Sequence, residues 1–396
     1  MMRTDLRHAT GVNLSAFTKF SCGDYVALVV IDIISQKLQC DVSDIMDVIL
    51  DEKPEEYVRR SYKTRNNRRG WARQKEFLRM SKKNTTTESA RKNGSPTCAR
   101  YRFSGHQTFV ARNGWLEKGV NLILNNPHGF LDSDAVVQLG VGKNMVESIK
   151  YWCQQTGLIE DAEDAGTMRL TDLGRFLFGD GKKAGVDPYL EDDASLWLLH
   201  YHIVTRAAQS TWSVVLNHYN KPEFTKPELE AFVSRYISDR KVTVSDKTIE
   251  RDVECFLHFY AGTRSKVFEE NVDAPFLALG LIQPTSSSGL WRMNIGRKHN
   301  LPDAVVGFAV LHFMLKTDDF APSLSSLLFD PFSPGQVFKL DQHAFVEALL
   351  RIEHNLKGIL RHHETAGMET VLYNGTRESV LNDAMAFLNQ YYGVEA

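Results

Sequence analysis

Hydrophobic residues recur with the spacing of an α-helix through much of the chain after Gly114. The first unit of this kind combines three helices, a short hairpin and a closing helix. Its predicted helices span residues 115–124, 134–139 with Ser133 as N-cap, 143–153, and 172–178 with Thr171 as N-cap, and its predicted strands span residues 158–160 and 168–171. This order of elements is typical of a winged helix-turn-helix domain.

The helix over residues 143–153 is the candidate for DNA recognition, because a B-DNA major groove is wide enough to admit an α-helix. The residues expected on its outward face are Lys143, Asn144, Glu147, Ser148, Lys150 and Tyr151. We expect Lys143 and Lys150 to contact phosphates and Asn144 and Ser148 to reach base edges, with Arg169 of the wing as a further DNA contact. Packing or binding of a protein partner by the same unit is the alternative.

A second unit follows the same plan. Thr225 and Ser245 are predicted to cap helices over residues 226–237 and 246–257, and residues 276–284 and 290–294 could pair as a wing. The outward face of the second helix is expected to carry Asp246, Glu250 and Asp252 beside Lys247 and Arg251. Because acidic side chains are unfavourable near phosphates, this unit is interpreted as architectural or as a docking surface.

The last hundred residues repeat the plan more weakly. Helices are expected over residues 303–315, 341–353 and 377–391, the last capped by Thr376, with a hairpin of residues 360–363 and 370–373. The predicted fold class is therefore mainly α, with tandem winged helix-turn-helix domains, short two-stranded wings and a helical N-terminal segment. The predicted parts are a helical basic N-terminal extension (1–80), a flexible linker (81–100), a first winged-helix domain (101–210), a second winged-helix-like domain (211–300) and a mainly helical C-terminal domain (301–396).

The charge of the chain is balanced overall but unevenly distributed. The 396 residues hold 47 Lys and Arg against 49 Asp and Glu, whereas residues 59–102 alone hold fifteen basic and two acidic residues. Such a basic run is either a solvated tail or a segment that contacts nucleic-acid phosphates. Met80 could also be the true start of the protein, so it stays open whether residues 1–79 belong to its native form.

Other features of the sequence argue against a membrane protein and against a secreted protein. The most apolar early run, residues 25–34, is too short for a membrane span, which needs about twenty residues. No secretory signal opens the chain, and the five cysteines are scattered without a Cys-x-x-Cys pair. We therefore expect a cytoplasmic protein with no membrane partner.

Polar side chains that could take part in catalysis are concentrated between residues 101 and 115. His106 could act as a general base near neutral pH, Arg112 could hold a phosphate through two hydrogen bonds, and Gln107 lies between them. These three are the candidate catalytic residues, on a segment that alternation over residues 102–110 predicts to be an extended strand or loop. Alternatively, His106 and Gln107 satisfy backbone groups at a seam between domains.

The sequence gives little support for binding of ATP or of a metal ion. The stretch Gly140–Lys143 lacks the spacing of a phosphate-binding loop, which excludes ATP binding there. Carboxylates at Asp187 and at residues 191–193 could hold a metal, but acidic residues at a helix start are already favoured by the helix dipole. We predict no metal site and no cofactor, with Mg²⁺ required only if the protein nicks DNA.

Three blocks, residues 103–119, 139–159 and 187–201, together resemble the domain-of-unknown-function 4007 family over roughly residues 101–396. Ala111 stands where an aromatic residue is expected. The resemblance implies a bacterial protein encoded beside PAPS-reductase-like sulfur-transfer genes, in systems that install phosphorothioate linkages in DNA as antiphage defence. It extends to the DNA-nicking component of such systems, but it supplies no catalytic residues.

The leading hypothesis is therefore a DNA-binding component of a phosphorothioate-modification system, with a PAPS-reductase-like sulfur-transfer protein as partner. Whether the chain is an enzyme, namely a metal-dependent DNA nickase, stays open. The alternatives are a winged-helix transcriptional regulator and a non-catalytic scaffold that docks the sulfur-transfer enzyme.

Overall fold

The computed structural model describes residues 100–394 except for residue 207 and residues 263–273, 287–288, 356–357 and 366. The predicted N-terminal extension lies outside the described residues, and so does the predicted linker apart from Arg100. The described residues are mainly helical, as predicted, with small sheets of two or three strands. Of the described residues, those within 100–316 and 320–394 belong to one compact unit. No helix of the described part combines the length and apolarity needed to cross a membrane.

The first group of elements matches the predicted order closely. It comprises α5 (Trp115–Asn125), η3 (Gly129–Leu131), α6 (Ala135–Leu139), α7 (Lys143–Gln155), β2 (Ile159–Asp161), β3 (Met168–Leu170) and α8 (Asp172–Phe178). Strands β2 and β3 form an antiparallel pair. The predicted Thr171 cap is confirmed, because its side chain accepts a hydrogen bond from the Gly174 N–H. The predicted Ser133 cap is wrong: Asp134 is the N-cap residue of α6, without a capping side-chain bond.

The second group contains a sheet of three strands. It comprises α9 (Asp193–Thr205), β4 (Ala208–Gln209), α10 (Thr211–His218), β5 (Glu223–Thr225), α11 (Lys226–Ser238), α12 (Asp246–Ala261), η4 (Pro275–Leu279), β6 (Ile282–Pro284) and β7 (Leu290–Met293). The strand order β5-β7-β6 corrects the expected two-stranded wing, because β5 adds along β7 and buries Phe224 completely. The Thr225 and Ser245 caps are confirmed. Strand β4 pairs in parallel with β1 (Arg100–Tyr101).

The third group is helical with one hairpin. It comprises α14 (Asp303–Thr317), α15 (Leu324–Phe329), α16 (Pro334–Phe338), α17 (Gln342–Asn355), β8 (Leu360–Thr365), β9 (Met368–Tyr373) and α18 (Val380–Tyr392). The last helix starts three residues later than predicted, with Ser379 as N-cap residue. Thr376 accepts a hydrogen bond from the Ser379 N–H through its side chain and so closes the preceding turn instead.

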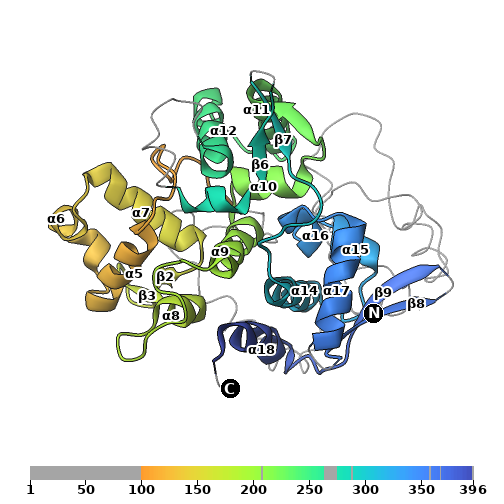
Figure 1. The fold of residues 1–396 in the computed structure, drawn as a ribbon. Helices are drawn as coiled ribbons and strands as arrows, with labels where there is room; N and C mark the ends of the chain where they lie inside the picture. Colours follow the sequence, from red (N-terminus) through yellow and green to blue (C-terminus); the bar gives the residue numbers. More distant parts are fainter. Residues whose placement is uncertain are drawn as a thin grey trace, which may run out of the picture. The chain divides into compact units, whose positions relative to one another are not determined.

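Helix α9 of the second group lies between the other elements of that group and the first and third groups (Figure 1). It is apolar on every side, as expected of a helix enclosed by protein, and Trp197, Leu198 and Leu199 are fully buried. His200, also fully buried, accepts a hydrogen bond from the Tyr260 hydroxyl at 2.7 Å and donates to the Val337 carbonyl at 2.9 Å. It thereby links α9 to α12 and α16.

Acid is expected to destabilise the protein through His200. Burial, with a contribution from Lys339, lowers the pKa of His200 to about 4 from its usual 6.5. The unfolded chain therefore binds this proton as the pH falls below about 6.5, whereas the folded chain does not until about pH 4, so stability is lost over this window. Urea unfolding should show the stability difference between wild type and His200→Gln shrinking by about 1.4 kcal/mol per pH unit from pH 6.5 to 5. A difference independent of pH would contradict this assignment.

Candidate nucleic-acid interface

Helix α7 is exposed in its N-terminal half and buried in its C-terminal half. It runs from the edge of the first group, next to α6, inward toward α9 (Figure 1). Lys143, Asn144 and Glu147 are exposed and Lys150 is half-buried, while Tyr151 and Trp152 are enclosed. The exposed part carries no acidic residue in its first turn and no capping side chain, so its free backbone N–H groups add partial positive charge.

The two lysines of this helix are available for a ligand. Neither Lys143 nor Lys150 pairs with a carboxylate in the part of the chain that the structure describes. They lie seven residues apart, two helical turns, and therefore share one face. Glu147 lies between them on that face and reduces its net positive charge.

Two residues predicted to face outward on α7 are buried. Ser148 is 0% exposed and Tyr151 is 1% exposed, so neither can reach a base edge. For Tyr151 the reason is steric: the loop that contains Gly105 lies against its ring, and a Cβ on Gly105 would lie only 2.3 Å from that ring. The spacing of residues along a helix does not show which of them are buried by another segment of the chain.

Arg169, the predicted DNA contact on β3, already has an acidic partner. Its guanidinium lies 2.8 Å from the Glu160 carboxylate across the β2–β3 pair. Both side chains are partly exposed, so the pair is weak and its net charge is close to zero. Arg169 therefore adds less positive charge to this surface than its sequence position indicates.

The loop that carries the candidate catalytic residues folds back on itself. Ser104, Gln107 and Thr108 have φ angles of 62°, 50° and 67°, a left-handed conformation that is uncommon for residues other than glycine. The segment is therefore a loop of tight turns, and the extended strand that alternation over residues 102–110 also allowed is wrong. Such a conformation persists only where surrounding contacts hold it.

Asp252 of α12 provides those contacts. Its carboxylate accepts hydrogen bonds from the Ser104 N–H at 2.8 Å, from His106 Nε2 at 3.0 Å and from the Thr211 hydroxyl at 3.1 Å. Asp252 and His106 are both fully buried. The prediction that Asp252 faces solvent is thus wrong. Its position, three residues after Ile249 and four before Phe256 on the apolar stripe, is the signal that could have revealed it.

His106 has no free ring nitrogen. Nδ1 accepts a hydrogen bond from the Thr108 N–H at 3.0 Å, and Nε2–H donates to Asp252 at 3.0 Å. The Trp152 and Trp212 rings enclose it. A general base must reach its substrate, and these contacts fit the alternative of a structural histidine at a seam.

The other two catalytic candidates lie apart from any reactive group. Gln107 is exposed, and half-buried Arg112 lies over the Trp115 ring with its guanidinium carbon 5.4 Å from the ring centroid. Arg112 is thus placed by stacking and keeps its hydrogen-bond donors for a ligand.

The acidic residues Asp187 and Asp192, which precede α9, accept hydrogen bonds from backbone N–H groups at the start of this helix. Asp187 accepts hydrogen bonds from the Glu191 and Asp192 N–H groups, and Asp192 caps the helix by accepting from the Ala194 N–H. Within the described residues, no three His, Cys, Asp or Glu side chains converge as metal ligands would.

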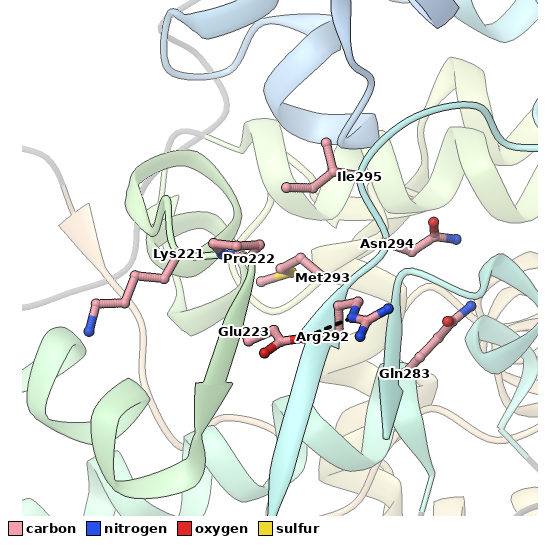
Figure 2. A pocket seen from close by; sticks show the side chains of 8 residues that line it. All are labelled: Lys221, Pro222, Glu223, Gln283, Arg292, Met293, Asn294 and Ile295. Atoms are coloured by element: carbon pink, nitrogen blue, oxygen red, sulfur yellow. Dashed lines mark hydrogen bonds and ion pairs between the residues drawn. The ribbon is translucent and has the colours of Figure 1, made fainter. Parts of the chain in front are cut away.

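A hollow of about 530 Å³ lies at one end of the β5–β7–β6 sheet. Arg292 points along the sheet toward Glu223, with Gln283 on its other side (Figure 2). The Arg292–Glu223 pair is 3.0 Å long, and Lys221 pairs with Glu228 at 3.4 Å. No pattern in the sequence indicates this hollow, because its lining comes from three separate strands. Its charges are largely paired, so we assign it no ligand.

Comparisons with known proteins give a consistent result. Residues 103–392 match the model of a family described as protein of unknown function (DUF4007). A magnesium-ion-bound crystal structure of SspB is similar, with a TM-score of 0.69, 27% identity, and coverage of 75% of this chain and 89% of that chain. A further SspB crystal structure has a TM-score of 0.67, 27% identity, and coverage of 75% and 90%. No curated protein sequence matches the chain.

Proposed function

Because the chain belongs to the DUF4007 family, we propose that it is a DNA-binding component of a bacterial system that installs phosphorothioate linkages in DNA. The likeness to SspB structures supports this assignment. The observation that carries the DNA-binding part is the exposed first half of α7, where Lys143 and Lys150 have no acidic partner among the described residues.

The proposed contacts follow from this geometry. Lys143 and Lys150 bind phosphates on one strand, and the α7 N-terminus adds backbone donors. Asn144, exposed next to Lys143, reaches base edges. Ser148 has no part in the interface because it is buried.

We further propose that the first two groups of elements are winged helix-turn-helix modules. The support comes from element order: three helices followed by a hairpin in the first group, and helix, strand, two helices and two strands in the second. In the second group, the sheet order β5-β7-β6 places the strand between the helices at the edge of the wing. Boundaries near residues 210 and 300 would then separate the modules, and the first boundary would leave α9 and β4 with the first module.

The DNA-binding proposal predicts a steep dependence of affinity on salt. Each phosphate contact should contribute a slope of about −0.9 to the logarithm of the association constant against the logarithm of salt concentration. A titration of a labelled duplex between 50 and 200 mM salt measures this slope for the full chain. An affinity that does not change with salt would refute phosphate contact as the basis of binding.

Nicking of DNA is a second candidate function, favoured by the magnesium bound in one SspB structure. The described residues do not supply a recognisable ligand set, so we derive no catalytic step from them. Supercoiled plasmid incubated with Mg²⁺ separates the two functions, since only a nickase converts it to the open circle. Association with a PAPS-reductase-like sulfur-transfer protein belongs to the same proposal and is tested by co-purification.

A further inference from the structure

Five basic side chains from three segments gather near the C-terminal ends of α9 and α14. We call them the basic cluster, which consists of Arg102, His202, Arg206, His312 and Lys316. The two helices lie side by side (Figure 1), and the Lys316 ammonium donates to the Thr205 carbonyl at 3.1 Å. The His202 and His312 rings lie 6.2 Å apart.

His202 and Arg206 both lie next to Gly157, which follows the C-terminal end of α7. A Cβ built on Gly157 would lie 3.5 Å from His202 Nδ1 and 3.6 Å from Arg206 Nη1. The Arg102 side chain approaches from β1, where it donates to Gln154 at 3.1 Å. The cluster thus depends on how α7, α9 and α14 pack together.

The cations of the basic cluster disfavour protonation of their neighbours. Burial and then Arg206 lower the pKa of Lys316 to about 8, and burial followed by Lys316 and Arg206 lowers the pKa of His202 to about 3. Burial lowers the pKa of Arg206, and Arg102 is the charged neighbour with the largest further effect.

The carboxylates near Arg206 are already engaged. Glu160 pairs with Arg169 at 2.8 Å, and Asp161 accepts a hydrogen bond from Gln154 at 3.4 Å. Glu160 and Asp161 each raise the pKa of Arg206 by less than Arg102 lowers it. Neither carboxylate forms an ion pair with Arg206 among the described residues.

The basic cluster also has unused hydrogen-bond donors. Within the described part of the chain, the Arg206 guanidinium makes no hydrogen bond or ion pair, and neither do the His202 ring nitrogens. His202, Arg206 and His312 are half-buried, and the Lys316 side chain is partly open to solvent although its ammonium lies against the Thr205 carbonyl. A ligand can therefore approach from solvent. The favourable effect of a cation at a helix C-terminus accounts for Lys316, which binds a terminal carbonyl, but not for the unpaired Arg206.

We propose that the basic cluster is a binding site for a phosphate group, held chiefly by Arg206 and Lys316 with Arg102 at its edge. A tetrahedral oxyanion brings the negative charge and the acceptors that these side chains lack, and arginine binds it through two parallel hydrogen bonds. The site uses none of the α7 lysines and so goes beyond the proposed function. The phosphate group could be free or part of a nucleic acid.

The test compares the full-length wild type with Arg206→Gln and Arg206→Lys, using Lys182→Gln as a control of equal charge change on an exposed loop. Calorimetric titration with inorganic phosphate, at an ionic strength held constant with chloride, should show affinity reduced about 10- to 100-fold by Arg206→Gln. Arg206→Lys should lose part of this affinity, and Lys182→Gln none. Without ligand, Arg206→Gln should unfold at the same or a higher temperature than wild type, because it relieves repulsion.

A second arm distinguishes the source of the phosphate group. Oligonucleotides with and without a 5′-phosphate are titrated into the same variants. Loss of oligonucleotide affinity in Arg206→Gln, with no binding of inorganic phosphate to wild type, would assign the site to nucleic acid. If neither probe distinguishes Arg206→Gln from wild type, or if Lys182→Gln loses as much affinity, the proposal is wrong. Because the first arm contains no DNA, its failure is separate from failure of the α7 interface.

Discussion

Replacement of Asp252 by alanine is expected to lower the free energy of unfolding by about 3–5 kcal/mol, the range measured when one partner of a buried polar pair is removed. The carboxylate has three donors, the Ser104 N–H, His106 Nε2 and the Thr211 hydroxyl. Without it, His106 and Thr211 are buried without an acceptor, the half-buried Ser104 N–H loses its partner, and the left-handed turns of the 104–108 loop lose their anchor. Urea unfolding followed by tryptophan fluorescence measures the effect, because Trp152 and Trp212 lie against His106.

Two further variants test whether this loss of stability comes from the hydrogen bonds of Asp252. Asp252→Asn keeps an oxygen for the Ser104 and His106 donors and should cost about 1–2 kcal/mol. Glu254→Ala changes an exposed acidic residue on the same helix and should shift stability by less than about 0.5 kcal/mol. Equal losses for Asp252→Ala and Glu254→Ala would show that Asp252 does not hold the seam.

The double variant Lys143→Glu, Lys150→Glu is expected to bind duplex DNA at least about tenfold more weakly at 0.1 M salt, with a salt slope reduced in magnitude by about two. The physical reason is the release of fewer counterions when two phosphate contacts are lost. Neither lysine has an acidic partner among the described residues, so the substitutions should leave folding intact. Fluorescence anisotropy of a labelled duplex measures affinity and slope together.

The matched control for this experiment is Lys182→Glu, Lys183→Glu. These exposed lysines lie on the loop between α8 and α9 and give the same change in net charge. A nonspecific effect of net charge would weaken both double variants equally. That outcome, or an unchanged slope for the α7 variant, would remove α7 from the interface.

Local patterns predicted most helices in the described part of the chain. Helices α5, α7, α11 and α12 begin where apolar periodicity and capping residues place them, because both signals act within a few residues. Helix ends were predicted less well, as at α12, which extends to Ala261 because its apolar stripe continues to pack. The α7 lysines, which periodicity also placed outside, are exposed or half-buried as expected.

Local patterns could not predict contacts between segments that are distant in the sequence. Asp252 and His106 are 146 positions apart, and only packing of the 104–108 loop on α12 turns a candidate base into a buried donor. The basic cluster likewise joins residues 102, 202–206 and 312–316, which no motif connects.

The amino-acid sequence by itself determined the family, the helical class and the basic outer face of α7, since these depend on local order and spacing. The tertiary structure alone decided which polar residues are enclosed and which cations are brought together. Burial and charge proximity depend on where remote segments meet, and the free energy of a charged or hydrogen-bonding group is set by those neighbours.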